Sequence, residues 1–154
     1  MKYFSVIILS VFILSCDSTR VYNDFNDLDN AYWHMDSVQH FSFKIEDTIK
    51  KYNILATFRN SSSYPFYNIY FQYSLKDSSN HTLEKKLTEL NFFDPKTGEP
   101  LGSGLGDLFD HTFPLEENYT FREPGEYRLA LQQFMRMDTL PFILSVGARV
   151  EFSE

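Results

Sequence analysis

The sequence has a single cysteine, Cys16, so no disulfide bond can form within the chain and the fold must rest on its hydrophobic core. The sequence also has few cationic residues: it contains 14 Lys and Arg against 21 Asp and Glu, which gives a formal net charge of −7. Binding of nucleic acid or anionic lipid through a basic surface needs clustered Lys and Arg. The pairs Lys50-Lys51 and Lys85-Lys86 are isolated, and we interpret them as solvent-facing charges. Nucleic acid is therefore not an expected partner.

Catalytic motifs are missing as well. The four histidines show no zinc-binding spacing, and no serine lies in a Gly-x-Ser-x-Gly elbow. The carboxylate pairs Glu116-Glu117 and Glu123/Glu126 stand without any other feature of a glycosidase. A glycine-rich segment, residues 101–107, lacks the flanking pattern of a phosphate loop and indicates a mobile loop between strands. We expect a protein that is not an enzyme and holds no cofactor.

Two acidic stretches are the remaining candidates for metal ligands. One comprises Asp107, Asp110 and His111. The other comprises Asp24, Asn26, Asp27 and Asp29, whose spacing departs from the calcium-loop pattern at Leu28. Solvated, turn-forming side chains are the better interpretation of both, so no metal site is predicted.

The N-terminus carries the pattern of a secretory signal peptide. Lys2 is followed by an apolar run that ends near Ser15, too short for the about 20 residues that a membrane-spanning helix needs. The run closes with Ile13-Leu14-Ser15-Cys16, which resembles the lipobox of bacterial lipoproteins. We expect cleavage between Ser15 and Cys16, with residues 1–15 removed and a diacylglycerol on the Cys16 sulfur. Two or three acyl chains would give effectively permanent anchoring to a membrane.

The rest of the chain reads as strands. Residues 16–37 are polar and rich in Asp and Asn, and we interpret them as the lipidated N-terminus and a tether. Residues 38–154 alternate apolar and polar side chains between turn signals, most clearly in 67–75. A helix over 83–90 is possible, although the flanking turns favour a strand. The pattern predicts one all-β domain, an antiparallel β-sandwich, Ig-like or jelly-roll-like, of about seven to eight strands.

Aromatic side chains are abundant, with 16 Phe and 10 Tyr in the chain. Most should pack in the core, but Trp33 and Tyr64 are tentative binding residues that could stack on a sugar or a partner protein if they are exposed. Tyr127, which follows Pro124-Gly125-Glu126, is placed to cap nearby backbone with its hydroxyl, as at the corner of many sandwich domains.

Several segments in order resemble the GldH-type gliding-motility lipoproteins of Bacteroidetes. They are the lipobox, residues 22–25 with Tyr32-Trp33, the turn at 93–102, and 124–127. The resemblance implies an envelope lipoprotein that supports assembly or stability of the gliding apparatus, which is linked to the type IX secretion system. It implies no enzymatic activity, and Cys16 is the only functional residue that it transfers.

Two functions stay open. The first is a non-enzymatic lipoprotein that contacts envelope proteins of the gliding and secretion machinery. We expect it on the periplasmic side of the outer membrane, because Asp17-Ser18-Thr19-Arg20 lacks the dense acidic run of a surface-export signal. The second is a carbohydrate-binding envelope lipoprotein that uses the tentative aromatic residues.

Replacing the acylated thiol tests the anchor directly. In cells fed a labelled fatty acid, the protein should carry the label and its Cys16→Ala variant should not, because only the sulfur accepts the diacylglycerol. Gel fluorography of envelope fractions measures this. A Cys16→Ala protein that matured normally and stayed at the membrane would contradict the anchor.

Overall fold

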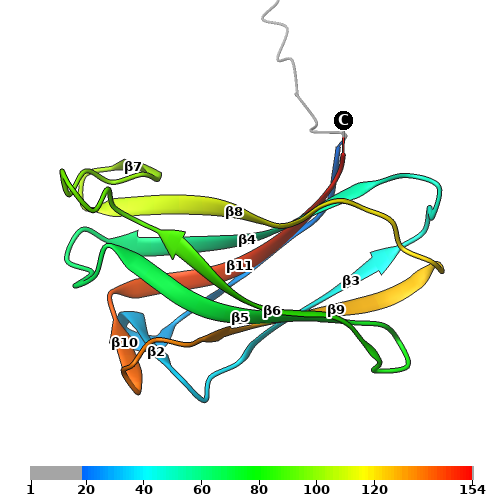
Figure 1. Cartoon of the computed structure of the whole chain (residues 1–154), viewed down its shortest axis with the longest axis horizontal. Coiled ribbons are helices and arrows are strands. Elements are labelled where there is room, and N and C mark those ends of the chain that lie inside the picture. The colour runs from blue at the N-terminus through cyan, green and yellow to red at the C-terminus, as the bar shows by residue number, and fades with distance from the viewer. Residues whose placement is uncertain (1–18, 154) are drawn as a thin grey trace, which may run out of the picture.

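The computed structural model describes residues 19–153; residues 1–18 and 154, which include the expected signal peptide, its cleavage site at Ser15 and Cys16, lie outside the described part. The described chain is built from strands, with one 3-10 turn, η1 (Asp29–Ala31), after the first of them (Figure 1). In chain order the strands are β1 (Arg20–Asp27), β2 (Tyr32–His34), β3 (Gln39–Ile45), β4 (Tyr52–Ser61), β5 (Asn68–Lys76), β6 (Thr82–Asn91), β7 (Ser103–Leu105), β8 (Leu108–Tyr119), β9 (Gly125–Gln133), β10 (Thr139–Pro141) and β11 (Ile143–Phe152).

Two antiparallel sheets form the layers of a sandwich. One has five strands in the order β1-β11-β4-β8-β7, and the other has four in the order β3-β9-β5-β6. The short strands β2 and β10 pair with each other at one end (Figure 1). The predicted all-β sandwich is confirmed. The described residues contain eleven strands, more than the seven to eight expected, because short strands carry too few residues to show alternation.

Alternation in the sequence predicted which side chains point inward. In β3, Phe41, Phe43 and Ile45 are buried and the residues between them are exposed. The segment for which a helix was the alternative is strand β6, whose residues pair with β5 along its length. The period of two is therefore a correct guide to strands β3, β5 and β9 of the four-stranded sheet, whereas β4 and β11 of the five-stranded sheet carry consecutive buried residues.

Aromatic rings fill the space between the sheets. Phe58 of β4 meets Phe71 of β5 across the interior, with ring centroids 4.9 Å apart in an edge-on arrangement. A second group forms where Phe121 contacts Tyr52 at 5.3 Å and Tyr127 at 4.5 Å. Facing sheets lie roughly 10 Å apart, a gap that large rings from both sides can fill. The abundance of Phe and Tyr thus supplies the core that a chain without disulfides needs.

The sandwich begins earlier than the sequence analysis placed it. Arg20–Asp27, assigned to the tether, is strand β1 and pairs with β11 at the edge of the five-stranded sheet. Tyr22 contacts the Phe43 ring at 5.7 Å, and the Asn26 side chain donates to Gln39 at 3.1 Å. The boundary at residue 38 is therefore wrong in the described chain. An edge strand with few apolar residues pointing inward gives little sequence signal.

The glycine-rich segment is a hairpin rather than a mobile loop. Ser103–Leu105 forms β7, which pairs with the start of β8. A Cβ at Gly104 would lie 2.1 Å from the Leu108 carbonyl oxygen, and one at Gly102 would lie 2.6 Å from the Asp110 carbonyl oxygen. Close approach of two backbones, which no larger residue permits, explains glycine at these positions.

Tyr127 forms the corner that the sequence predicted. Its hydroxyl donates to the Glu123 carbonyl oxygen at 2.7 Å, and its ring packs against Phe43 and Phe121. Burial raises the pKa of Tyr127, so the hydroxyl stays protonated and keeps donating at neutral pH. The contact fixes the turn that leads into β9.

Removal of this hydroxyl should lower the free energy of unfolding. Tyr127→Phe keeps the ring and deletes one intramolecular hydrogen bond, so we expect a loss of about 1 kcal/mol in urea unfolding. Tyr119→Phe is the matched control, because in the described chain the Tyr119 hydroxyl has no hydrogen bond and its ring packs against Phe121. Equal losses in both variants would contradict the role assigned to the corner.

Candidate functional site

The two aromatic residues proposed for binding are buried. Trp33 has 0% of its surface exposed, and its Nε1 donates to the Ser37 carbonyl oxygen at 2.8 Å. Tyr64 is 5% exposed and donates its hydroxyl to the Asn68 carbonyl oxygen at 2.9 Å. The expectation that they could stack on a ligand is therefore wrong for this structure. In β2 the exposed positions are the neighbours of Trp33, and one of them, Tyr32, faces solvent.

The acidic residues considered as metal ligands have other partners or point apart. Asp110 forms a two-bond ion pair with Arg59 at 2.7 and 2.9 Å, and this pair lowers the pKa of the Asp110 carboxyl. His111, the next residue of β8, points to the opposite face and is buried. Between residues 19 and 153 no group of three or more His, Cys, Asp or Glu side chains is placed to hold a metal ion.

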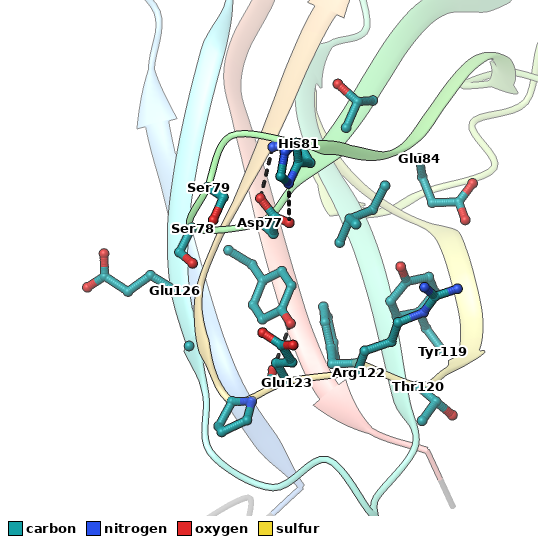
Figure 2. Close-up of a pocket in the computed structure, with 16 residues that line it drawn as sticks. Asp77, Ser78, Ser79, His81, Glu84, Tyr119, Thr120, Arg122, Glu123 and Glu126 are labelled. Atoms are coloured by element: carbon teal, nitrogen blue, oxygen red, sulfur yellow. Dashed lines mark hydrogen bonds and ion pairs between the residues drawn. The ribbon is translucent and has the colours of Figure 1, made fainter.

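A cleft of about 670 Å³ opens at one end of the sandwich, between the β5–β6 turn and the β8–β9 connection (Figure 2). One of its charged groups, Asp77, bonds the local backbone. The Asp77 carboxylate accepts hydrogen bonds from the His81 amide at 2.8 Å and from the His81 ring at 3.3 Å. The hydrogen bond from the amide lowers the pKa of Asp77. Glu123, one of the acids considered for glycosidase chemistry, gives its carbonyl to the corner tyrosine.

In the other carboxylate pair, Glu116-Glu117, Glu117 is exposed to solvent and Glu116 belongs to a hydrogen-bond network. Glu116 accepts from the Tyr73 hydroxyl at 2.6 Å and from Lys86 at 2.5 Å, which links β8 to β5 and β6 across the open side of the sandwich. The arrangement ties the two sheets together. Burial and the bond to Glu116 raise the pKa of Tyr73, which keeps its proton for this bond.

His111, which the sequence analysis considered only as a metal ligand, is a buried group. Its ring lies 4.5 Å from that of Phe92, centroid to centroid, and it is 5% exposed. Burial lowers its pKa from 6.5 to about 4, so the imidazole is neutral at physiological pH. The signal available in the sequence was its alternation with Phe109 and Phe113 in β8, which places it on the inward face.

Several segments with exposed apolar side chains lie at the end of the sandwich that is on the left in Figure 1, where β7, β2 and β10 are found. We call six of them the apolar end: Tyr32, Met35, Leu105, Leu108, Met137 and Phe142. Their backbones are linked in series. Leu105 pairs with Leu108 and Leu108 with Ser61. The Ser61 amide then donates to the Phe142 carbonyl oxygen at 3.0 Å.

Leu105 is the most exposed member of the apolar end. It is 93% exposed at the tip of the β7–β8 hairpin, beside Gly106, whose φ is +68°. Large exposed apolar patches are uncommon on monomeric proteins and mark interaction sites. Neither hydrophobicity nor periodicity alone reveals this one, because its members come from four separate chain segments.

The chain enters the sandwich at the opposite end. The Phe152 amide donates to the Thr19 carbonyl oxygen at 2.8 Å, so the start of β1 and the end of β11 lie together, as Figure 1 shows beside the label of the C-terminus. The apolar end is thus separated from this attachment point by the full length of the strands. Residues 19–153 include no helix with the length and apolar character that crossing a bilayer requires.

Comparison with known families gives a match over nearly all of the described chain. The sequence profile described as GldH lipoprotein matches residues 20–150. A "Gliding motility lipoprotein GldH homolog" from Christiangramia forsetii is 32% identical over 98% of this chain and 93% of its own length. The "Gliding motility lipoprotein GldH" of Flavobacterium johnsoniae is 28% identical over 95% of this chain and 93% of its own length.

Among solved structures, the fold is similar to a carbohydrate-binding module, CBM28, described as specific for non-crystalline cellulose. The TM-score is 0.46 at 9% identity, covering 86% of this chain and 73% of that one. At this level the similarity carries no inference about a ligand.

The buried His111 should make stability depend on pH. Between pH 6.5 and 4 the unfolded chain binds a proton at this site that the folded chain does not, so the free energy of unfolding falls as pH falls. Between pH 7 and pH 5 this site should lower the free energy of unfolding, measured with urea, by roughly 1–2 kcal/mol. The His111→Gln variant keeps every carboxylate of the protein, so its free energy of unfolding should depend less steeply on pH in this range. Identical pH dependence in the two proteins would refute the contribution assigned to His111.

Proposed function

The chain belongs to the GldH lipoprotein family, and from that premise we propose that it is a non-enzymatic component that supports the gliding-motility and type IX secretion apparatus by contacting envelope proteins through its apolar end. Its relatives are named as gliding-motility lipoproteins, and as a member of this family the chain is associated with the envelope through lipid. The finer assignment rests on the surface of the sandwich.

Lipid on Cys16 supplies the anchor in this proposal. Only Asp17 and Ser18 separate the cysteine from Thr19, and Thr19 already bonds to the end of β11. A sandwich attached there holds its opposite end, with Leu105 at the tip, away from the lipid. The membrane is the outer membrane, and the domain faces the periplasm.

The apolar end is the observation that carries the protein-contact role. Its six side chains are exposed, come from β2, the β7–β8 hairpin and the segments around β10, and are held by backbone bonds to neighbouring strands. Interface cores are enriched in aromatic residues and Met and depleted of charged residues. The apolar end has this composition: Tyr32, Phe142 and two methionines, with leucines beside them.

The geometry of the polar groups supports a non-enzymatic role. Asp110, Glu116 and Asp77 each act as acceptors for a defined internal partner, and the pKa of Asp77 and Asp110 is lowered. A general acid needs a carboxyl whose pKa is raised toward the working pH. The carbohydrate-binding alternative named Trp33 and Tyr64, and both are buried in the core.

A pair of double variants tests the contact surface. Leu105→Ser with Leu108→Ser removes two exposed side chains from the apolar end, and Leu83→Ser with Leu87→Ser removes two exposed leucines from the four-stranded sheet. If the apolar end binds a partner, the first pair should weaken recovery of envelope proteins in crosslinked pull-downs by roughly tenfold, since anchor residues each contribute about 1 kcal/mol or more.

The same strains report on function. Colony spreading and surface display of secreted adhesins should fail with the apolar-end pair and stay normal with the control pair. Normal spreading with both, or equal loss with both while the proteins remain folded and anchored, would rule out the apolar end as the contact site.

A further inference from the structure

An exposed apolar residue also lies at the end of the sandwich where β1 begins, opposite the apolar end. Ile49, in the turn between β3 and β4, is 93% exposed, as much as Leu105 at the far end. Lys50 and Lys51 follow it directly. An isoleucine side chain in water is unfavourable, and this one has two cations beside it.

The turn is rigidly held, so the exposure of Ile49 is built into the fold. The Asp47 carboxylate accepts from the amides of Ile49 at 2.8 Å and Lys50 at 3.3 Å. The Tyr52 hydroxyl donates to the Asp47 carbonyl oxygen at 2.5 Å, and the Tyr52 ring is buried against Phe121. These bonds fix the turn to the core and keep its tip outside.

The turn lies next to the point where the lipidated segment begins. The Ser153 amide donates to the Lys51 carbonyl oxygen at 2.9 Å, and the neighbouring Phe152 amide donates to Thr19 at 2.8 Å. Three residue steps separate Thr19 from Cys16, a span of at most roughly 10 Å. A bilayer holding acyl chains on Cys16 therefore lies within reach of this corner, at the upper right of the sandwich in Figure 1.

The charges of the turn suit a lipid surface. Within residues 19–153 neither Lys50 nor Lys51 is paired with a carboxylate; the Lys50 ammonium lies 3.9 Å from the centroid of the Phe152 ring. Of the two acids in the turn, Glu46 is paired with Lys44 at 3.0 Å and Asp47 caps backbone amides. Lysines near a membrane surface are attracted to anionic headgroups. The net charge of −7 opposes a broad basic contact, but a turn beside an acyl anchor needs only local attraction.

We propose that the β3–β4 turn is a second membrane contact, in which Ile49 enters the boundary between headgroups and acyl chains while Lys50 and Lys51 bind anionic headgroups. The contact rests on the proposed lipid anchor at Cys16. It adds a second point of contact to the lipid anchor and so fixes the orientation of the domain, with the apolar end directed away from the bilayer.

Depth-sensitive quenching tests the contact. The acylated full chain carrying Ile49→Trp is reconstituted into vesicles of phosphatidylcholine and phosphatidylglycerol with brominated acyl chains. Leu105→Trp is the matched control, because both positions are 93% exposed and lie at opposite ends. The fluorescence of the native Trp33, fully buried, is subtracted using the unsubstituted protein.

The expected result is loss of emission and a blue shift for Ile49→Trp, with neither change for Leu105→Trp. Adding Lys50→Glu and Lys51→Glu to Ile49→Trp should weaken the quenching. Protein that floats with the vesicles but shows equal quenching at both positions, or none at position 49, overturns the turn contact and leaves the anchor intact. Acylated protein that does not float with the vesicles overturns the anchor and the turn contact together.

Discussion

Packing of aromatic rings between two sheets is the interaction on which the rest of the structure depends. The ring contact between Phe58 and Phe71 joins the five-stranded to the four-stranded sheet, and the Phe121 cluster closes the opposite half of the interior. No disulfide is available to share this task. Because aromatic rings fill the space between the layers, Trp33 and Tyr64 lie in the core and are not available at the surface for binding.

The same sandwich separates the surface into two ends with different tasks. At one end β1 begins beside the end of β11, next to the turn with Ile49; the other end carries the apolar end with Leu105. Antiparallel strands that run the length of the sheets keep the two ends apart. A protein that must hold a partner at a distance from a membrane needs such a rigid spacer, and hydrogen-bonded sheets provide one.

Much of the fold follows from local pattern. Alternation located the inward residues of β3 and β5, and the turn before β9 indicated the corner where Tyr127 bonds to Glu123. The proposed binding surface did not follow in the same way. Its residues come from segments that are distant in the chain, and each exposed leucine or methionine is unremarkable by itself. The inward position of His111 could have been found from its alternation with the aromatic residues of its strand.

The sequence by itself determined the all-β class and the family, and it predicted the export and anchor signal at Cys16, because these depend on a period of two, on the order of motifs along the chain and on short motifs. Only the tertiary structure decided that Arg20–Asp27 is a strand, since its partner β11 lies more than a hundred residues away. It also decided that Trp33 is buried while Ile49 and Leu105 stand at opposite ends. Burial depends on what the rest of the chain brings beside a residue, and hydrophobicity along the sequence does not contain that information.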